Sequence, residues 1–387
     1  RPFDQLSGLC VKLEADSSEH AARLRDVLGQ IRYNARCCAV DRRAGAFLDE
    51  NEILEDQDAE EIEKYQEFVP MFEKMRELSE LLRKNRHARG SIDFDFPEAK
   101  IILDKKGKPV DIRPYEANTA TKIIEDFMLL ANETVASEYF WQEIPFLYRV
   151  HDTPDPEKIQ ALAEFIRNFG YGLKGVQDEV HPKELQKLLS RVADSPEEAL
   201  ISRLTLRSMK QARYSTECTG HFGLAAKYYT HFTSPIRRYP DLQIHRIIKE
   251  NLRGRLNAER IAHYQEILPE VAEHSSKTER RADEAERDTD KMKKAEYMQQ
   301  HIGEEYEGVI SSITSWGMYV ELPNTIEGLI HVANLYDDRY YYNENTHEMV
   351  GSDLGKVYKL GQSIRVRVLD ADKENATIDF VPAAIWG

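Results

Sequence analysis

The chain has 387 residues, of which 41% are hydrophobic and 31% are charged, and its formal net charge is −15. This composition is typical of a soluble globular protein, and the length allows two or three domains. No apolar run is long enough to span a membrane and no secretory leader precedes the first elements, so we expect a cytoplasmic protein with no membrane partner.

The negative charge is unevenly distributed along the chain. Carboxylates are dense between positions 49 and 67, where Lys64 is the single basic residue. An acidic surface repels a polyanion, but net charge acts mainly on association rate and non-specific affinity. The charge therefore disfavours an RNA partner without excluding it, because a local basic channel can still bind RNA.

Residues 1–48 are mixed polar sequence with one possible helix at 19–31, and we leave their fold unassigned. The chain has four cysteines, which are Cys10, Cys37, Cys38 and Cys218. They have no metal-binding spacing, and an adjacent pair is poorly suited to a structural disulfide. This pattern fits a reducing compartment.

The next stretch mixes helix and strand patterns. Residues 60–83 have apolar positions at three- and four-residue steps, which predicts an amphipathic helix. Residues 91–96 alternate apolar and acidic positions and predict a half-buried strand, and 100–112 predict a hairpin. Asp93 and Asp95 share one face of that strand. They could hold a divalent cation, although a solvated or salt-bridged face is the commoner arrangement.

Helices dominate the middle of the chain. The expected helices are residues 123–140, 156–169, 182–189, 196–211 and 240–252. A long charged helical stretch follows at 258–301. We expect it to be broken or bent near Leu268-Pro269, because proline removes a backbone hydrogen bond inside a helix.

Residues 231–248 are the most informative segment. The residue before a proline avoids helical geometry, as at Ser234, whereas Pro240 suits the first turn of a helix. Arg237 and Arg238 are therefore expected on a connector beside a helix N-terminus. Two guanidinium groups and unpaired backbone N–H groups there favour an anion, above all a phosphate.

Aromatic and basic residues surround this pair. The rings are Tyr228, Tyr229, Phe232 and Tyr239, and the basic residues along the helix are His245, Arg246, Lys249 and Arg253. Such interleaving suits single-stranded RNA, with phosphates on the cations and bases on the rings. Paired arginines are also often solvated or bound to carboxylates. Asp241 and His245 share a helix face, where a salt bridge is commoner than a pair of metal ligands.

The last part of the chain reads as a separate all-β module. Its expected strands are residues 309–313, 317–322, 327–331, 357–360, 363–369 and 376–380. Short alternating strands with glycine turns over about 80 residues predict a small closed barrel. The module is more acidic than basic, so RNA binding there would depend on stacking and a local patch. Alternatively, Trp316 and Tyr319 only cap the barrel.

These residues also carry a family resemblance. Thr233-Ser-Pro-Ile-Arg-Arg-Tyr-Pro-Asp241, followed by Ile244-His-Arg246, resembles the hallmark segment of the ribonuclease II/ribonuclease R family of bacterial 3′→5′ exoribonucleases. Further blocks are similar to that family and follow its order: Arg89–Glu98, Phe127–Glu133, Gly220–Leu224 and Ala285–Asp288. The similarity covers roughly residues 49–382, and a long ordered run of motifs is highly specific.

The resemblance implies an α+β fold. Residues 49–301 would be the C-terminal part of a mixed α/β ribonuclease catalytic domain, 302–382 an OB-fold RNA-binding barrel, and 383–387 a tail. It implies two catalytic residues: Arg237 would hold the scissile phosphate, and Glu286 would lie near the active centre. The RNA-binding residues that it implies are His231, Arg238, Tyr239, Trp316, Tyr319, His331 and Arg365.

The family's metal-binding aspartates, of the form Asp-x5-Asp-x-Asp-Asp, are not found in this sequence, and neither are its N-terminal cold-shock-type barrels. We therefore expect a C-terminal part of a longer, monomeric, Mg²⁺-dependent enzyme that degrades single-stranded RNA processively to nucleoside 5′-monophosphates. The chain alone should hold no metal ligands and be inactive. The alternatives are a non-catalytic RNA-binding or regulatory relative, and a scaffold whose arginines bind protein carboxylates.

Overall fold

The fold is known from a computed structural model, which describes residues 66–383 except 93, 95–97, 116–117, 176–178, 196 and 345. The described chain divides into two compact units. The first contains the described residues within 66–93, 117–153 and 210–278. The second contains those within 94–116, 154–209 and 279–383. The chain thus passes repeatedly between the units.

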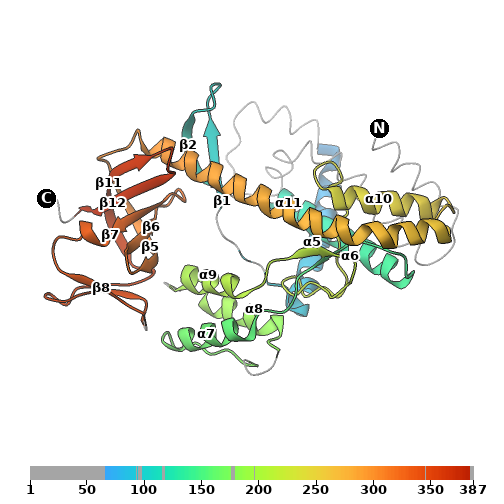
Figure 1. Cartoon of the computed structure of the whole chain (residues 1–387), viewed down its shortest axis with the longest axis horizontal. Coiled ribbons are helices and arrows are strands. Elements are labelled where there is room, and N and C mark those ends of the chain that lie inside the picture. Colours follow the sequence, from blue (N-terminus) through green and yellow to red (C-terminus); the bar gives the residue numbers. More distant parts are fainter. Residues whose placement is uncertain are drawn as a thin grey trace. The chain divides into compact units, whose positions relative to one another are not determined.

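The first unit is mainly helical (Figure 1). Its elements are the short 3-10 helix η2 (Gln66–Phe68), the helices α5 (Val69–Arg89), α6 (Thr119–Trp141) and α10 (Tyr239–Leu252), the first part of α11 (Ala258–Met298), and the strands β3 (Tyr148–Val150) and β4 (Arg213–Ser215). Local sequence sets their ends. The side chain of Asn118 caps α6 by accepting from the Thr121 N–H, and α5 ends at Gly90 in a left-handed conformation.

A buried carboxylate joins α5 to α6. Asp126 is 1% exposed and accepts hydrogen bonds from Ser79 Oγ (2.6 Å), Arg83 Nη2 (2.7 Å) and Arg86 Nη1 (2.7 Å). Beside it the same two helices form a small apolar cluster of Phe72, Ile123 and Phe127. Because the charge is paired and fully hydrogen-bonded, its burial is tolerated.

The main core of the first unit lies between α6, α10 and α11. The inner face of α10 contributes Ile244, Ile247 and Ile248, and α11 contributes Tyr264, Leu268 and Ala272. These residues recur at three- and four-residue steps, which is the period of one helix face. The core therefore fixes the position of α10, which directly follows Arg237 and Arg238.

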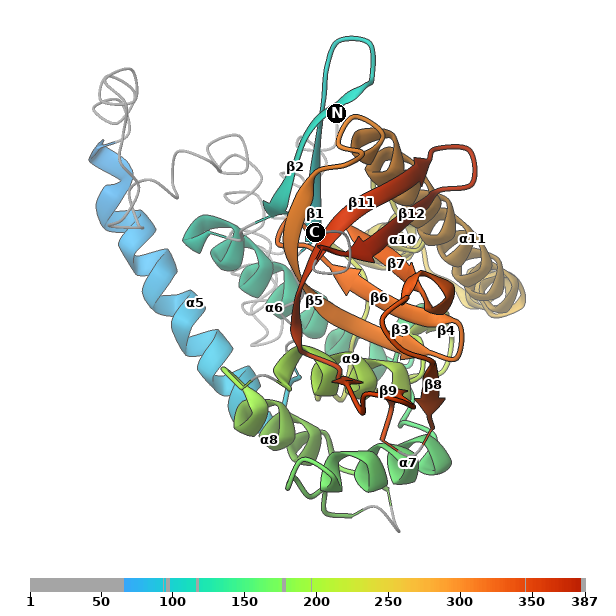
Figure 2. The same cartoon turned by 90° about the vertical axis from the view of Figure 1, so that its left-hand side faces the viewer.

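The second unit combines a hairpin, three helices and the second part of α11, one small three-stranded sheet and a barrel (Figure 2). Its first elements are the hairpin strands β1 (Glu98–Leu103) and β2 (Pro109–Tyr115), and the helices α7 (Pro156–Arg167), α8 (Pro182–Val192) and α9 (Glu198–Ser208). The barrel region contains β5 (Glu305–Thr314), β6 (Gly317–Glu321), β7 (Glu327–His331), η3 (Val332–Asn334), β8 (Tyr340–Asn343), β9 (Glu348–Gly351), β10 (Val357–Tyr358), β11 (Ser363–Asp372) and β12 (Thr377–Pro382). Helix α9 packs against both α7 and α8.

Five strands close the barrel in the order β11-β12-β7-β6-β5. All neighbours pair antiparallel except β12 and β7, which pair in parallel at Asp379 and Leu329. Glycine is required where the strands approach closely. A Cβ on Gly317 would lie 2.2 Å from the Ile330 carbonyl oxygen, and one on Gly328 would lie 2.5 Å from the Phe380 ring. These contacts leave no room for a side chain.

The expected fold class is confirmed: mixed helices and strands are followed by a closed five-stranded barrel. Some details were wrong. Ser91, Ile92 and Phe94 lie in no strand, because the Ile92 N–H donates to the Gly223 carbonyl instead of to a sheet partner. The strand at 357–360 pairs with β9 outside the barrel.

Of the break or bend expected near Leu268-Pro269, the break was wrong. Helix α11 is continuous through Pro269 from Ala258 to Met298. Leu268 is fully buried and Ala272 lies one turn later in the same core. The packing of this turn offsets the one backbone hydrogen bond that the proline removes.

Candidate nucleic-acid interface

One buried carboxylate holds the arginine loop, which we define as residues 233–238. Asp241 lies in the first turn of α10 and is 0% exposed. It accepts from the Ser234 N–H (2.8 Å) and from Nε and Nη2 of Arg238 (2.9 and 2.8 Å). The N–H groups of Arg237 and Arg238 donate back to the Ser234 carbonyl. Arg238 is therefore occupied by an internal bidentate ion pair that shapes the loop.

Arg237 has a different environment. Its side chain is exposed and forms no hydrogen bond or ion pair with any residue that the structure describes. It precedes the N-terminus of α10, where the first backbone N–H groups have no partner within the helix. Of the two arginines, Arg237 is thus the one placed to receive a phosphate.

Tyr239 lies beside this loop and remains accessible. Its side chain is 51% exposed, and the guanidinium carbon of Arg246 lies 5.8 Å from the ring centroid. Nη1 of Arg246 also donates to the Tyr239 hydroxyl at 3.5 Å. An exposed ring next to a cation can stack a base while the cation contacts its phosphate.

A chain of rings lies beneath the loop. His231 Nδ1 lies 2.8 Å from the Tyr214 hydroxyl, and the two rings meet edge to face. His231 contacts Tyr229 in the same way, Tyr229 contacts His221, and His221 contacts His151, with centroids 5.0–5.8 Å apart. Edge-to-face contact is a preferred geometry for such rings. His231 is consequently part of a packed platform.

Burial keeps this platform uncharged. Desolvation, together with the nearby Arg238 and Arg149, lowers the pKa of His231 to about 2. Desolvation and the neighbouring His151 lower the pKa of His221 to about 3. Both rings are therefore neutral at pH 7, and His231 supports the loop without adding a positive charge for RNA.

Residues from the other segments that resemble the family contact this group of rings. Asn132 accepts from the Phe232 N–H at 2.9 Å and donates to the Tyr229 hydroxyl at 3.1 Å. His245 lies 2.8 Å from the Phe232 carbonyl and its ring stacks on Phe232 at 4.4 Å. The Gly223 N–H donates to a ring nitrogen of His151. Asp241 and His245 are thus structural residues and not a pair of metal ligands.

Glu286 lies on the second part of α11. It is exposed on α11 and its side chain makes no hydrogen bond or ion pair with the described residues. Arg237 belongs to the first compact unit and Glu286 to the second. The catalytic role that the resemblance implies for this carboxylate therefore stays a prediction.

Three of the implied RNA-binding residues do meet on the barrel. Trp316 Nε1 donates to the Tyr319 hydroxyl at 3.3 Å, and Gly317 between them pairs with His331 across β6 and β7. Trp316 is 51% exposed and His331 is exposed, while the His331 ring caps η3 by accepting from the Ala333 N–H. This grouping forms an aromatic face of the barrel, which we define as Trp316, Tyr319 and His331.

Arg365 lies on another strand of the barrel, β11. Its side chain is 64% exposed and its Nε lies 3.1 Å from a carboxylate oxygen of Glu305. A pair this exposed is screened by solvent and can exchange partners readily. Arg365 therefore remains available to an RNA phosphate.

The described residues offer no metal site. Among them, no group of three or more histidine, cysteine, aspartate or glutamate side chains is arranged to hold a metal ion. Asp93 and Asp95 lie outside the described residues, as does most of the acidic stretch at 49–67. No helix of the described part has both the length and the apolar composition needed to cross a bilayer.

Comparison with known proteins identifies the family. The RNB domain model matches residues 42–254, which is more than half of the chain, and the S1 RNA binding domain model matches residues 299–381. The chain belongs to the ribonuclease II/ribonuclease R family. This is a family of nucleases that generally depend on divalent metal ions.

Several relatives are called ribonuclease R. Ribonuclease R 1 of Lactococcus lactis is 46% identical over 319 residues, covering 82% of this chain and 39% of that protein. Ribonuclease R of Thermotoga maritima is 46% identical over 335 residues, covering 86% of this chain and 47% of that protein. The chain therefore spans less than half the length of these curated relatives.

A solved structure shares the fold. Mycoplasma genitalium RNase R, in complex with ribose methylated single-stranded RNA, superposes with a TM-score of 0.78 at 27% identity. The match covers 88% of this chain and 52% of that protein. It extends over most of both units, so the fold of the described chain is that of this nuclease family.

Sequence reasoning missed part of the interface. Tyr214 and His151 lie in no motif, and Asn132 lies in the block Phe127–Glu133 without a role assigned to it, although the three residues together support the loop. A signal existed for Asn132, because a polar residue within the apolar stretch of a helix usually has a structural hydrogen-bonding partner. The ion pair of Arg238 and the buried ring contact of His231 are not visible in a sequence, and the RNA-binding roles that the resemblance implies for these two residues stay predictions.

Proposed function

We propose that the chain is the C-terminal part of a processive 3′→5′ exoribonuclease that releases nucleoside 5′-monophosphates from single-stranded RNA. The observation that carries this proposal is the exposed guanidinium of Arg237 on a loop fixed by buried Asp241. A preorganised cation stabilises negative charge that develops on a phosphate without further rearrangement. The ribonuclease R relatives support the same activity.

Each residue has a distinct role in this proposal. Arg237 holds the scissile phosphate, and Glu286 assists through a hydrogen bond or a water molecule. Arg238 fixes the loop through Asp241, and His231 supports it from below. The RNA strand is contacted by Tyr239 near the 3′ end and, on the barrel, by Trp316, Tyr319, His331 and Arg365. Residues 49–301 serve as the catalytic part and 302–382 as the RNA-binding barrel.

The complete enzyme is proposed to be a cytoplasmic monomer that uses Mg²⁺. The described residues do not fit a metal site, so the ion's ligands belong to other parts of the protein. What these residues do by themselves is bind and orient the RNA. The arginine loop provides a fixed positive charge, and the aromatic face of the barrel provides stacking surfaces.

The first test is an exonuclease assay of the purified chain on labelled single-stranded RNA, with and without Mg²⁺. We expect weak RNA binding and no release of nucleoside monophosphates. Magnesium-dependent release would mean that the chain holds a metal site, and Asp93→Asn with Asp95→Asn would then be the first variants to examine. Absence of RNA binding would overturn the proposal.

The role of Arg237 is tested in a longer protein that contains the aspartate cluster. Arg237→Ala should lower turnover by about 10²–10³-fold, as the loss of a charge-stabilising group does, with little change in RNA affinity. Equal losses in turnover and affinity would mean that Arg237 only binds. The alternative, a non-catalytic RNA-binding relative, is distinguished by the reading frame upstream of Arg1, where an in-frame aspartate cluster supports the enzyme.

A further inference from the structure

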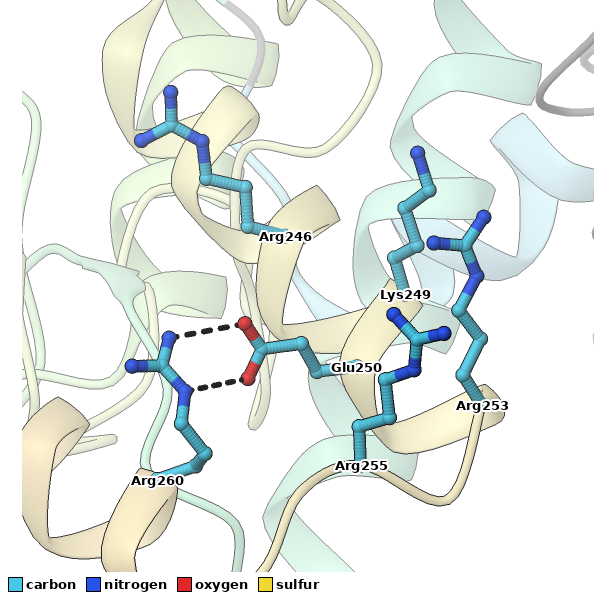
Figure 3. A pocket seen from close by; sticks show the side chains of 6 residues that line it. All are labelled: Arg246, Lys249, Glu250, Arg253, Arg255 and Arg260. Atoms are coloured by element: carbon cyan, nitrogen blue, oxygen red, sulfur yellow. Dashed lines mark hydrogen bonds and ion pairs between the residues drawn. The ribbon is translucent and has the colours of Figure 1, made fainter.

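A strongly basic pocket lies at the C-terminal end of α10 (Figure 3). Its volume is about 340 Å³, and it is lined by Arg246, Lys249, Glu250, Arg253, Arg255 and Arg260. All six residues belong to the first unit. Five cationic side chains against one carboxylate make this a concentrated positive site on a chain whose net charge is −15.

The single carboxylate is already paired. Glu250 accepts two hydrogen bonds from Arg260, from Nε and Nη2, each at 2.9 Å. Arg260 Nη2 also donates to the Tyr264 hydroxyl at 3.0 Å. This bidentate pair joins the last turn of α10 to the first turn of α11, and it cancels its own charge. Besides this pair, Arg246, Arg253 and Arg255 line the pocket and make no ion pair with the described residues.

Helix capping explains only part of this cluster. Cations near a helix C-terminus are stabilised by the carbonyl groups of the last turn, which accounts for Lys249 and Arg253. Arg246 lies nearly two turns before the end of α10, and Arg255 lies beyond it. A capping role therefore does not explain why all of them line one pocket.

The turn after α10 holds two arginines next to the pocket. Gly254 has a φ of +64°, a left-handed conformation, and the Arg255 N–H donates to the Glu250 carbonyl at 2.9 Å. Arg253 and Arg255 flank this glycine, are exposed, and make no side-chain hydrogen bond or ion pair within the described part of the chain. Like charges gathered in this way repel one another unless an anion lies between them.

We propose that this pocket binds phosphate groups, either those of an RNA backbone or that of a free nucleoside 5′-monophosphate. Guanidinium groups bind phosphate bidentately, and several of them around one pocket can share its oxygens. Among the described residues, no aromatic ring lines the pocket, so we expect binding there that depends on the phosphate and not on the base.

The pocket is separate from the arginine loop. Arg253 and the loop lie at opposite ends of the 14-residue helix α10, which at a rise of 1.5 Å per residue is about 20 Å long. Arg246 lines the pocket on the side nearer the loop and also contacts the Tyr239 ring. The inference goes beyond the proposed hydrolysis, because phosphate binding here needs no cleavage and can be measured in a chain that cleaves nothing.

The test uses the double variant Arg253→Ala/Arg255→Ala of the full 387-residue chain. In the first arm, the affinity for a labelled single-stranded RNA is measured over a range of salt concentrations. Each phosphate contact contributes about 0.7 to the slope of log affinity against log salt, so the loss of two contacts should reduce it by about 1.4. In the second arm, equilibrium dialysis measures binding of labelled adenosine 5′-monophosphate, which the variant should weaken several-fold.

The two arms identify the source of the phosphate. A changed slope with unchanged nucleotide binding assigns the pocket to RNA, and the reverse assigns it to free nucleotides. The matched control is Arg76→Ala/Lys84→Ala on α5, which removes the same charge from side chains without a hydrogen bond or ion pair to described residues. If the pocket variant behaves like this control in both arms while its circular dichroism spectrum is native, the inference is wrong.

Discussion

The arginine loop and the aromatic face of the barrel are built in opposite ways. At the loop, the rings are buried: Tyr214 and Tyr229 are each 5% exposed and Phe232 is 2% exposed. The accessible group there is a cation, Arg237. On the barrel the accessible group is a ring, since Trp316 is 51% exposed, and the strands around it are rich in carboxylates.

In the proposed function, this difference corresponds to two modes of RNA contact. A cation held by a buried network has a fixed direction, which suits a phosphate on which charge develops. An exposed ring on an acidic module attracts little by charge, but it stacks any base. The loop is therefore suited to the chemistry of one phosphate, and the barrel to holding a passing strand.

The largest expected effect concerns the buried network of the loop. Asp241→Ala removes a fully buried carboxylate and leaves Arg238 without its partner. Breaking a buried pair by removing one member costs about 3–5 kcal/mol, measured here as the free energy of unfolding in urea. The control is Asp288→Ala, which changes an exposed carboxylate of α11. Similar stability of the two variants would show that the network does not hold the loop.

The next largest effect is a loss of stability in acid. His221 and His231 stay neutral in the folded protein because burial lowers their pKa to about 3 and about 2, whereas the unfolded chain protonates both near pH 6.5. The stabilisation is present above pH 6.5 and is lost as the pH falls below it. From pH 7.5 to pH 5.5, protonation of these two rings in the unfolded chain should lower the free energy of unfolding by about 2–3 kcal/mol.

Urea unfolding at both pH values measures this loss. His231→Gln should reduce the difference by about 1.4 kcal/mol, which is half of the contribution of His221 and His231, because this ring no longer takes up a proton on unfolding. His263→Gln is the control, since His263 is exposed in the folded protein. An unchanged pH dependence in the His231 variant would contradict the neutral platform beneath the loop.

The aromatic face should matter for binding and not for stability. Trp316→Ala removes a half-exposed ring and should weaken binding of single-stranded RNA by about 1–3 kcal/mol, the usual contribution of one stacked base. Fluorescence anisotropy at fixed salt measures this change. Tyr341→Ala is a matched control, because Tyr341 is 52% exposed on β8 of the same unit. Equal losses would show that stacking is not confined to the aromatic face.

The smallest effect is expected at Arg365. Its ion pair with Glu305 is exposed, so Arg365→Ala should leave the unfolding transition unchanged. If Arg365 contacts one RNA phosphate, the salt slope of binding should fall by about 0.7. Arg367→Ala is the control, because Arg367 pairs with the same glutamate but is less exposed. A slope unaffected in both variants would remove Arg365 from the RNA-binding surface.

The sequence predicted the elements better than the roles of their side chains. Periodicity located α6, α7, α8 and α10, and glycine spacing located the barrel, because these patterns are local. Ser91, Ile92 and Phe94 lie in no strand although their alternation predicted one, because the backbone of Ile92 bonds to Gly223 far along the chain. Long-range pairing of this kind is not encoded in a local pattern.

The site was predictable only in part. Proline placement correctly located Arg237 and Arg238 at the start of α10, because the rule acts on neighbouring residues. Asp241 forms an ion pair with Arg238, so Arg237 is the arginine without an ion pair to the described residues. The sequence alone does not show which of the two arginines Asp241 binds. The neutral state of His231 depends on burial by Tyr214 and Tyr229, which lie elsewhere in the sequence. Such contacts arise only when the chain is folded.

The hydrogen bonds and ion pairs of Asp126 between α5 and α6 have a consequence for preparing fragments of this protein. Asp126 is satisfied entirely by α5, through Ser79, Arg83 and Arg86. A fragment that begins after α5 would contain α6 with an uncompensated buried carboxylate and an uncovered apolar face at Ile123 and Phe127. Such a fragment should aggregate or be degraded in the cell. A soluble fragment of this protein should therefore start before Gln66 or exclude α6 altogether.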